Sequence, residues 1–281
     1  MKKTQVMVNG LPGKMATMVV KALAHDKDQR YEIIPLSFTG PEIIESYTVL
    51  LLNNKGVQFD FIKPSDRLER RHEISHKWPG VIMVDFTLPD ATNENCDFYC
   101  QNGWPFVMGT TGGNRDLLTE TIIESAISAV ISPNMSIPIV TMMSMIEYAA
   151  TTFPDALKGF RLCIDESHQA GKKDKSGTAH KIGENLKLLG VDYQGIDSIN
   201  DIRDTVRQIL MGVPKADLGG HAYHNYRLLS PDDTVQLGFL HNVNGRDTYV
   251  DGTLKAIDFL AKQVSEDIRG KCFSMIDVLK G

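Results

Sequence analysis

Apolar and polar positions follow two different patterns along the first half of the chain. Short runs of β-branched and other apolar residues predict buried strands, and the longer amphipathic stretches between them are typical of helices. A strand followed each time by a helix requires crossover connections, so we expect an α/β, Rossmann-like doubly wound fold with a parallel sheet. The expected strands are 4–9, 31–37, 57–62, 81–85, 106–109 and 129–131, and the expected helices are 13–25, 65–77, 91–102 and 115–125.

The strict alternation of strand and helix ends near Pro133, and we expect a second lobe to begin there. The turn Ser230-Pro231-Asp232-Asp233 lies between two strand-like stretches and so predicts an antiparallel pair. The second half is expected to contain helices at 137–152 and 254–264, strands at 160–165, 220–229 and 234–242, and a short final segment at 275–279.

Composition narrows the class of protein. The 281 residues are 42% hydrophobic and 23% charged, which is sufficient for packed cores. A formal net charge of −5 gives no positive field to attract a polyanion, so we expect no nucleic acid partner. The apolar run 48–52 is far shorter than the ~20 residues of a membrane helix, so we expect no membrane association.

The cysteines and the N-terminus bear on the compartment. Four cysteines in so long a chain do not make a disulfide framework, and they lack paired C-x-x-C spacing. Cys96 and Cys100 are four residues apart on an expected helix, where helix packing explains them better than metal binding, so we expect no metal. Met1-Lys2-Lys3 leads directly into a strand without a targeting pattern. We expect the cytoplasm, or the plastid stroma if a transit peptide has been removed.

The turn after the first expected strand is rich in glycine. Gly10 and Gly13 are placed to let the backbone bend and approach a pyrophosphate, and the following helix start, with Lys14 and Met15, offers N–H groups to it. Pro12 stands where the common G-x-G-x-x-G pattern has its middle glycine and removes one donor. The turn predicts a dinucleotide site, and an ordinary tight β-α turn is the alternative.

The end of the second expected strand bears on which dinucleotide binds. NAD-specific sites usually place an acid there, whereas this chain has Ser37, Phe38 and Thr39. The hydroxyl groups and Lys14 suit a 2′-phosphate, which favours NADPH, with NADH as the other cofactor to consider. Alternatively, Ser37 and Thr39 are only turn formers.

Two further strand ends carry polar or glycine-rich sequences. Asp85, Phe86 and Thr87 end one buried strand, and Gly109, Thr110 and Thr111 follow the next. Carboxyl ends of parallel strands meet at one edge of the sheet, where such folds bind ligands. We expect backbone amides of 109–111 to bond a nicotinamide carboxamide, with a generic glycine-rich turn as the alternative.

The stretch 166–179 concentrates residues that handle charge and protons. His168 is its one imidazole and suits a proton donor near neutral pH, and Lys172 is one of three nearby lysines. Ser176, Gly177 and Thr178 stand at a helix start, whose N–H groups can bind a carboxylate. A solvated basic loop with an incidental histidine is the alternative.

These motifs, in this order and with Ser132 to Ser136 added, resemble the 4-hydroxy-tetrahydrodipicolinate reductases (dihydrodipicolinate reductases) over nearly the whole chain. The most specific element is E-x-H-x-x-x-K-x-D-x-S-G-T-A at 166–179. Gln169 stands where the bacterial pattern has a second histidine, and a proline before Ser176 is absent, so the plant-type branch fits best. The resemblance adds Pro133, Asn134 and Met135 to the cofactor site and Gln169 to the substrate site.

The resemblance also implies an organisation and a reaction. A dinucleotide-binding domain (1–135 and 252–281) would be joined to a smaller α+β domain with a mixed sheet (136–251) for substrate binding and oligomerisation, as a dimer or tetramer. The reaction would be hydride transfer from NADPH or NADH to a cyclic dicarboxylate in lysine biosynthesis. His168 would donate the proton, Lys172 would bind substrate and share the proton transfer, and Ser176, Gly177 and Thr178 would hold a carboxylate.

His241 and Arg246 match a polar stretch of the same family, for which we expect a structural role, with Arg246 supporting the site. Two other functions remain open from the sequence. One is a different NAD(P)-dependent dehydrogenase of amino-acid metabolism, and the other is a non-catalytic NADP-binding sensor. The lysine-rich loop ending in Ser-Gly-Thr argues against the first, and a functional requirement for His168 would exclude the second.

Overall fold

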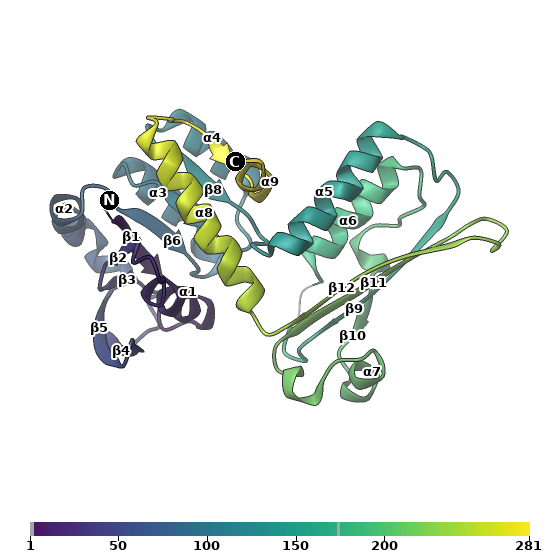
Figure 1. The fold of residues 1–281 in the computed structure, drawn as a ribbon, viewed down its shortest axis with the longest axis horizontal. Coiled ribbons are helices and arrows are strands. Elements are labelled where there is room, and N and C mark those ends of the chain that lie inside the picture. Colours follow the sequence, from purple (N-terminus) through teal and green to yellow (C-terminus); the bar gives the residue numbers. More distant parts are fainter. Residues whose placement is uncertain (1–2, 173–174) are drawn as a thin grey trace. The chain divides into compact units, whose positions relative to one another are not determined.

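The computed structural model describes residues 3–172 and 175–281 and divides the chain into two compact units (Figure 1). Unit 1 comprises 1–136 and 249–281, and unit 2 comprises 137–248. These bounds lie within three residues of those expected for the two domains.

A parallel six-stranded sheet forms the centre of unit 1. Its order is β13-β8-β7-β6-β1-β2, and each neighbouring pair runs parallel, which confirms the expected fold class. β6 is buried at every position, as expected of a central parallel strand covered on both faces. The strands are β1 Thr4–Asn9, β2 Tyr31–Ile33, β6 Ile82–Asp85, β7 Phe106–Met108, β8 Ala129–Ile131 and β13 Cys272–Phe273.

Helices cover both faces of this sheet (Figure 1). α1 buries Ala16, Val19, Val20 and Leu23, which share one face at helical spacing. Side chains of α2, α3 and α4 pack with alternate residues of β1, β6 and β7 in one hydrophobic core. The helices are α1 Lys14–Ala24, α2 Arg67–Lys77, α3 Thr92–Gln101, α4 Arg115–Glu124, α8 Asp247–Ser265, which belongs to unit 1 from Tyr249, and α9 Met275–Lys280.

A separate three-stranded sheet in unit 1 corrects two sequence expectations. The strand expected at 31–37 is interrupted at Pro35, which lacks the N–H that a ladder needs, so β2 and β3 belong to different sheets. The strand expected at 57–62 pairs with β3 and β4 and not with the central sheet. The order is β3-β5-β4, with β3 Leu36–Phe38, β4 Tyr47–Leu52 and β5 Lys55–Ile62.

Unit 2 is built on a mixed sheet with the order β10-β9-β11-β12. β9 pairs parallel with β10 and antiparallel with β11, which also pairs antiparallel with β12. Helices α5 and α6 pack on one face, where Ala179 and Ile182 of α6 join Ile164 and Tyr226 of the sheet in a second core. The elements are α5 Ile137–Thr152, β9 Arg161–His168, α6 Gly177–Leu188, β10 Asn200–Ile202, α7 Thr205–Leu210, β11 His221–Leu229 and β12 Gln236–Asn244.

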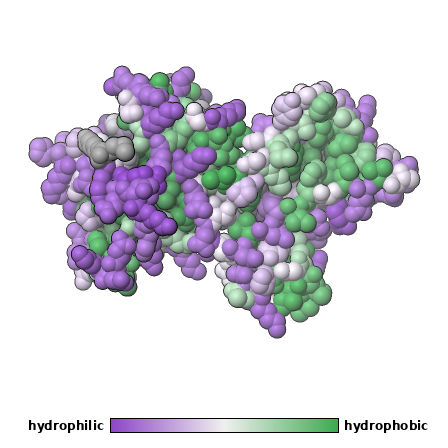
Figure 2. Space-filling model, viewed as in Figure 1, coloured by the Kyte–Doolittle hydropathy of each residue, from purple (hydrophilic) through white to green (hydrophobic). Residues whose placement is uncertain are grey.

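The surface of unit 2 exposes several large apolar side chains. Val206 and Leu210 are exposed on α7, and Leu237 and Leu240 are exposed on β12. Figure 2 shows apolar residues gathered on the surface in the region of α7. Among the described helices, none combines the length and apolar character that a membrane span requires.

Candidate cofactor and catalytic sites

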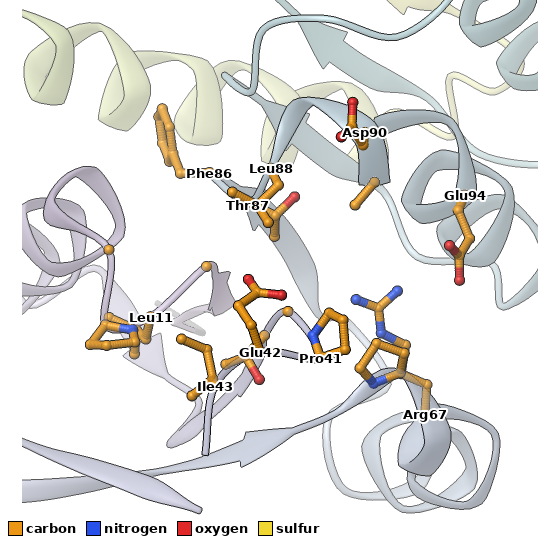
Figure 3. Close-up of a pocket in the computed structure, with 17 residues that line it drawn as sticks. Leu11, Pro41, Glu42, Ile43, Arg67, Phe86, Thr87, Leu88, Asp90 and Glu94 are labelled. Carbon is orange, nitrogen blue, oxygen red and sulfur yellow. The ribbon is translucent and has the colours of Figure 1, made fainter. Parts of the chain in front are cut away.

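The main cavity of unit 1 opens at the carboxyl ends of β1 and β6 and measures about 720 Å³ (Figure 3). The strand order reverses at these strands, since β2 lies on one side of β1 and β6 on the other. Doubly wound sheets bind ligands at this point. Gly10 and Gly13, from the turn after β1, line the cavity together with Phe86 and Thr87, which follow β6.

The first glycine of the turn is required by its backbone. Gly10 has φ +100°, and its amide donates to the Phe38 carbonyl at 2.9 Å. A Cβ at this position would lie 2.2 Å from the carbonyl oxygen of Phe86, so only glycine fits. Gly13 is the N-cap of α1, so the first turn of that helix begins at the cavity and supplies N–H groups suited to a phosphate.

Three residues expected near the cofactor do not line this cavity, so their contact with the cofactor stays a prediction. Ser37 is fully buried, and its hydroxyl oxygen accepts from the Leu11 amide at 3.1 Å, so it supports the glycine turn from below. This placement differs from the expected contact between its hydroxyl group and a 2′-phosphate. Lys14 is exposed on α1, and neither it nor Met15 lines the cavity.

The cavity contains charged residues that the sequence did not single out, and it also contains Thr39, whose hydroxyl group was expected near a 2′-phosphate. Arg67 is only 6% exposed, and its guanidinium lies over the Phe38 ring and donates to Asn95 at 2.7 Å. The buried hydroxyl oxygen of Thr39 has no hydrogen-bond partner among residues 3–172 and 175–281. Figure 3 shows the exposed Glu42 carboxylate and the Arg67 guanidinium both directed into the cavity.

Asp85 ends β6 as a buried acceptor that organises the strand-end loops. Its carboxylate accepts from Thr110 at 2.5 Å, from the hydroxyl group of Thr87 at 2.8 Å and from Tyr99 at 2.7 Å. Burial and the Asp85 charge raise the pKa of Tyr99, so the phenol stays a donor. Asp85 and Thr110 do not line the main cavity, so their expected role as direct cofactor contacts stays a prediction.

The loops after β7 and β8 lie at the same edge of the sheet. The amides of Gly109 and Thr110 donate to the Asp85 carbonyl at 3.0 and 3.3 Å, which differs from the expected bonds to a carboxamide. The Phe86 ring lies so close to Gly109 that a Cβ there would be 2.3 Å from it. Of the other residues expected at the cofactor in these loops, Thr111 and Pro133 are exposed, whereas Asn134 and Met135 are buried.

His168 ends β9 in unit 2 with one ring edge fixed. Its Nδ1 lies 3.2 Å from the His221 carbonyl oxygen, and Gln208 donates to its backbone carbonyl at 2.7 Å. Its Nε2 has no hydrogen-bond partner within the described part of the chain. Burial, and then the charge of Lys172, lower the pKa of His168 to about 3, so the ring is neutral at pH 7.

A buried carboxylate two residues earlier holds the helix start that follows the loop. Glu166 is 0% exposed and accepts from the Ser176 amide at 2.8 Å and from the Arg203 guanidinium at 2.8 Å. Ser176 in turn caps α6, because its hydroxyl oxygen accepts from the Ala179 amide. Ser176 was expected at the site from its sequence pattern, whereas no role was expected for Glu166 or Arg203.

The remaining loop residues have different environments. Gln169 and Lys172 are half-buried, with the Lys172 amide donating to the Gln169 carbonyl at 3.0 Å. Gly177 is exposed and Thr178 is half-buried at the start of α6. Lys175, expected to flank an anion site, instead donates to the Asp197 and Ile199 carbonyls at 2.9 and 2.6 Å. Lys173, the remaining expected lysine, lies outside the described residues.

A row of histidines crosses the sheet beside His168. His224 is 2% exposed, its ring packs on His168 and His241, and neither of its nitrogens has a hydrogen-bond partner among the residues described. Ligand atoms of Glu166, His168 and His224 lie within 4.8 Å of one another. Both Glu166 oxygens already accept hydrogen bonds and Arg203 adds a positive charge, so the group is poorly suited to a cation.

Comparisons with known proteins cover both units. Residues 4–135 match the family model described as "Dihydrodipicolinate reductase, N-terminus", and residues 138–279 match its C-terminal counterpart. The chain is 41% identical over 276 residues to 4-hydroxy-tetrahydrodipicolinate reductase 1, chloroplastic, of Arabidopsis thaliana, covering 98% of this chain and 77% of that protein.

Bacterial relatives are more distant. Identity to the reductase of Herminiimonas arsenicoxydans is 26% over 99% of both chains, so the plant-type resemblance is confirmed. The structure of a dipicolinate-bound dihydrodipicolinate reductase from Paenisporosarcina sp. TG-14 has the same fold. It aligns with a TM-score of 0.64 and 20% identity, covering 98% of this chain and 99% of that one.

Proposed function

This chain belongs to the dihydrodipicolinate reductase family of NAD(P)H-dependent oxidoreductases in lysine biosynthesis, and we propose that unit 1 binds the cofactor and unit 2 the substrate. The substrate is 4-hydroxy-tetrahydrodipicolinate and the product is tetrahydrodipicolinate. One NADPH and one proton are consumed, and one NADP⁺ and one water are released, because the product lacks the 4-hydroxyl group.

The free edge of the His168 ring supports its role as the proton donor. Nδ1–H donates to the His221 carbonyl, so the neutral ring presents Nε2 as an acceptor at the end of β9. The cofactor, when bound, would supply a hydride. Loss of the 4-hydroxyl group as water gives the conjugated ring, and hydride addition to that ring leaves a negative charge that a proton must neutralise. Protonated at Nε2, His168 supplies this proton.

His168 must take up this proton when the substrate binds, because its ring is neutral in the ligand-free protein. A dicarboxylate adds negative charge beside the imidazole, which favours the charged form and raises the pKa of His168 from its low value of about 3. Dipicolinate, the molecule in the relative's structure, suits this test as an unreactive dicarboxylate. Calorimetry in buffers of different ionisation enthalpy should detect net proton uptake on binding.

The start of α6 supports a seat for one substrate carboxylate. Gly177 is exposed and Thr178 follows it, so the first turn of the helix offers N–H groups at its positive end. Lys172 stands in the loop before this turn and contributes a positive charge that attracts the same anion. Together with Gln169, these residues form the proposed substrate site of unit 2.

Replacement of the two charged loop residues tests this function. We expect His168→Ala and Lys172→Ala to lower kcat/KM for 4-hydroxy-tetrahydrodipicolinate by roughly 10²–10⁴-fold, while NADPH affinity stays unchanged. Gln169→Ala is the matched control in the same loop and should raise KM without changing the pH profile. Full activity in both charged-residue variants would refute the mechanism and would leave a non-catalytic NADP-binding protein as the better explanation.

The cavity of unit 1 supports a preference for NADPH over NADH, through Thr39, whose hydroxyl group was expected to contribute, and through Arg67, which was not expected. Arg67 is held in place by Asn95 and offers a fixed positive charge. The Thr39 hydroxyl, which has no hydrogen-bond partner among the described residues, can donate to a 2′-phosphate. Glu42 opposes this charge, but it is exposed and can change rotamer at little cost. Arg67→Met should weaken NADPH far more than NADH, and equal losses would contradict the assignment.

We also propose that unit 2 associates with a second copy of itself, as a dimer or tetramer. The edge strand β12 exposes Leu237 and Leu240, and α7 exposes Leu210. Light scattering on the purified protein should give a multiple of 31.3 kDa.

For the compartment we propose the cytoplasm or the plastid stroma. The free cysteines and the chloroplastic relatives support these reducing compartments, and cell fractionation tests the choice.

A further inference from the structure

We propose that Arg203 is a positioning residue for the reductase reaction. Through Glu166 it fixes both ends of the loop that links His168 to α6, and it neutralises the buried carboxylate beside the substrate site. The expected effect on catalysis rests on the proposed function. The contacts do not, because they are present in the ligand-free protein.

The carboxylate of Glu166 joins the two sides of the loop. It precedes His168 by two positions on β9, and it accepts from the amide of Ser176, the residue that begins α6. The strand end with the proton donor and the helix end with the proposed carboxylate seat are therefore tied to one buried group.

Arg203 connects this carboxylate to the middle of the loop. It follows β10, which pairs with β9, and its Nη2 donates to Glu166 at 2.8 Å while its Nε donates to the Lys172 carbonyl at 3.3 Å. One planar guanidinium thus sets the position of Lys172 relative to Glu166. A lysine could keep the charge but not both directions of donation.

Neighbouring residues support the loop from the same segment of chain. Gln208 donates to the carbonyl of His168, and Lys175 donates to the Asp197 and Ile199 carbonyls. Four residues of the segment 197–208 therefore support the described loop residues, and Arg203 is the one whose charge contacts Glu166.

The charge of Arg203 also matters for a dicarboxylate substrate. Glu166 is fully buried, so its negative charge is poorly screened and would repel an anion at the α6 start. Arg203, with its side chain 20% exposed, compensates for this charge. Without it, the substrate would meet both a displaced Lys172 and an unpaired buried carboxylate.

Kinetics of four variants test the positioning role. Arg203→Lys should lower kcat/KM by roughly 10²-fold, the scale of a misplaced catalytic group, and Arg203→Ala by more. NADPH affinity should not change, and added methylguanidine should partly restore Arg203→Ala but not His168→Ala. The control is Arg207→Lys on the exposed surface of α7, which should behave as wild type. Wild-type rates in Arg203→Lys would overturn the proposal.

The pH profile separates positioning from a general loss of structure. The charged and titratable groups facing His168 are Lys172, Arg203, His221, His224 and Glu166. Removing the positive charge of Arg203 should raise the pKa of His168, the group that must be protonated to donate, and so move the alkaline limb of kcat/KM to higher pH, which a merely structural role would not do.

Hydrogen exchange tests the contacts that Arg203 and Glu166 make with the loop, here called the clamp, and it does not require turnover. In the ligand-free protein, Arg203→Ala should speed exchange of amides at 175–179, with Ser176 most affected, and leave β11 protected. Unchanged exchange would overturn the clamp even in an active enzyme. An inactive wild type with faster exchange in Arg203→Ala would instead refute the proposed function and leave the clamp supported.

Discussion

Lowering the pH should destabilise unit 2 through its buried histidines. Burial lowers the pKa of His241 to about 4, and burial with the charge of Lys172 lowers that of His168 to about 3. Burial also lowers the pKa of His224 well below its usual value. Unfolding exposes all three rings, which then take up protons with pKa values near 6.5.

The sign and size of the effect follow from proton linkage. Above pH 6.5 the three histidines are neutral in both the folded and the unfolded state, so the free energy of unfolding is at its full value. Below pH 6.5 only the unfolded state takes up protons on these rings, and the free energy of unfolding falls. At pH 5.0 the unfolded ring is about 1.5 pH units below its pKa, so at about 1.36 kcal/mol per unit each histidine costs about 2 kcal/mol. Three such rings give a loss of about 6 kcal/mol between pH 7.5 and 5.0.

Tryptophan fluorescence does not report this loss, because Trp78 and Trp104 both lie in unit 1. Urea-dependent hydrogen exchange of β11 peptides, corrected for the intrinsic rate at each pH, measures the opening free energy of unit 2. His241→Gln should reduce the pH-dependent loss by about 2 kcal/mol. His76→Gln, at an exposed position on α2, is the control. If the opening free energy of unit 2 in the wild type changed by less than about 1 kcal/mol between pH 7.5 and 5.0, the reasoning would be refuted.

Three further substitutions give independent tests. Ser37→Ala removes the acceptor of the Leu11 amide and should lower the stability of unit 1 by about 1–3 kcal/mol in urea unfolding; an unchanged midpoint would contradict this role. Tyr99→Phe removes a buried donor to Asp85 and should cost a similar amount, measured in the same way. Lys175→Met should speed amide exchange at 197–199 while NADPH titration gives the wild-type affinity, and a weakened cofactor would count against its local role.

Local sequence patterns predicted most of unit 1 because its strands and helices are short and strongly periodic. The helical pattern at 137–152 likewise predicted α5 with its observed bounds. The three-stranded sheet was missed because Pro35 divides an apolar run that looks continuous, and only the paired strands show which sheet each half joins. β4 was missed because its exposed positions include Val49 and Leu51, which hide the alternation of a half-buried strand.

The functional residues also divide into those that local sequence predicted and those that it did not. Gly10 and His168 were found because their chemistry is visible in the residues around them. Arg67, Glu166 and Arg203 were missed because each acts through a partner distant in sequence. Arg203 is 37 residues from Glu166, and Arg67 is 28 residues from Asn95. Such pairs depend on how strands and helices pack, and no local spacing encodes them.

The three-stranded sheet beside the central one gives unit 1 a modular construction. The segments around it supply Thr39, Glu42 and Arg67 to the cavity, whereas Gly10 and Phe86 come from the central sheet. Substitution of an exposed residue of this module, such as Glu42, can therefore alter one wall of the cavity without disturbing the parallel strands. Selectivity between related dinucleotides is thus open to evolution, or to redesign, at such exposed positions.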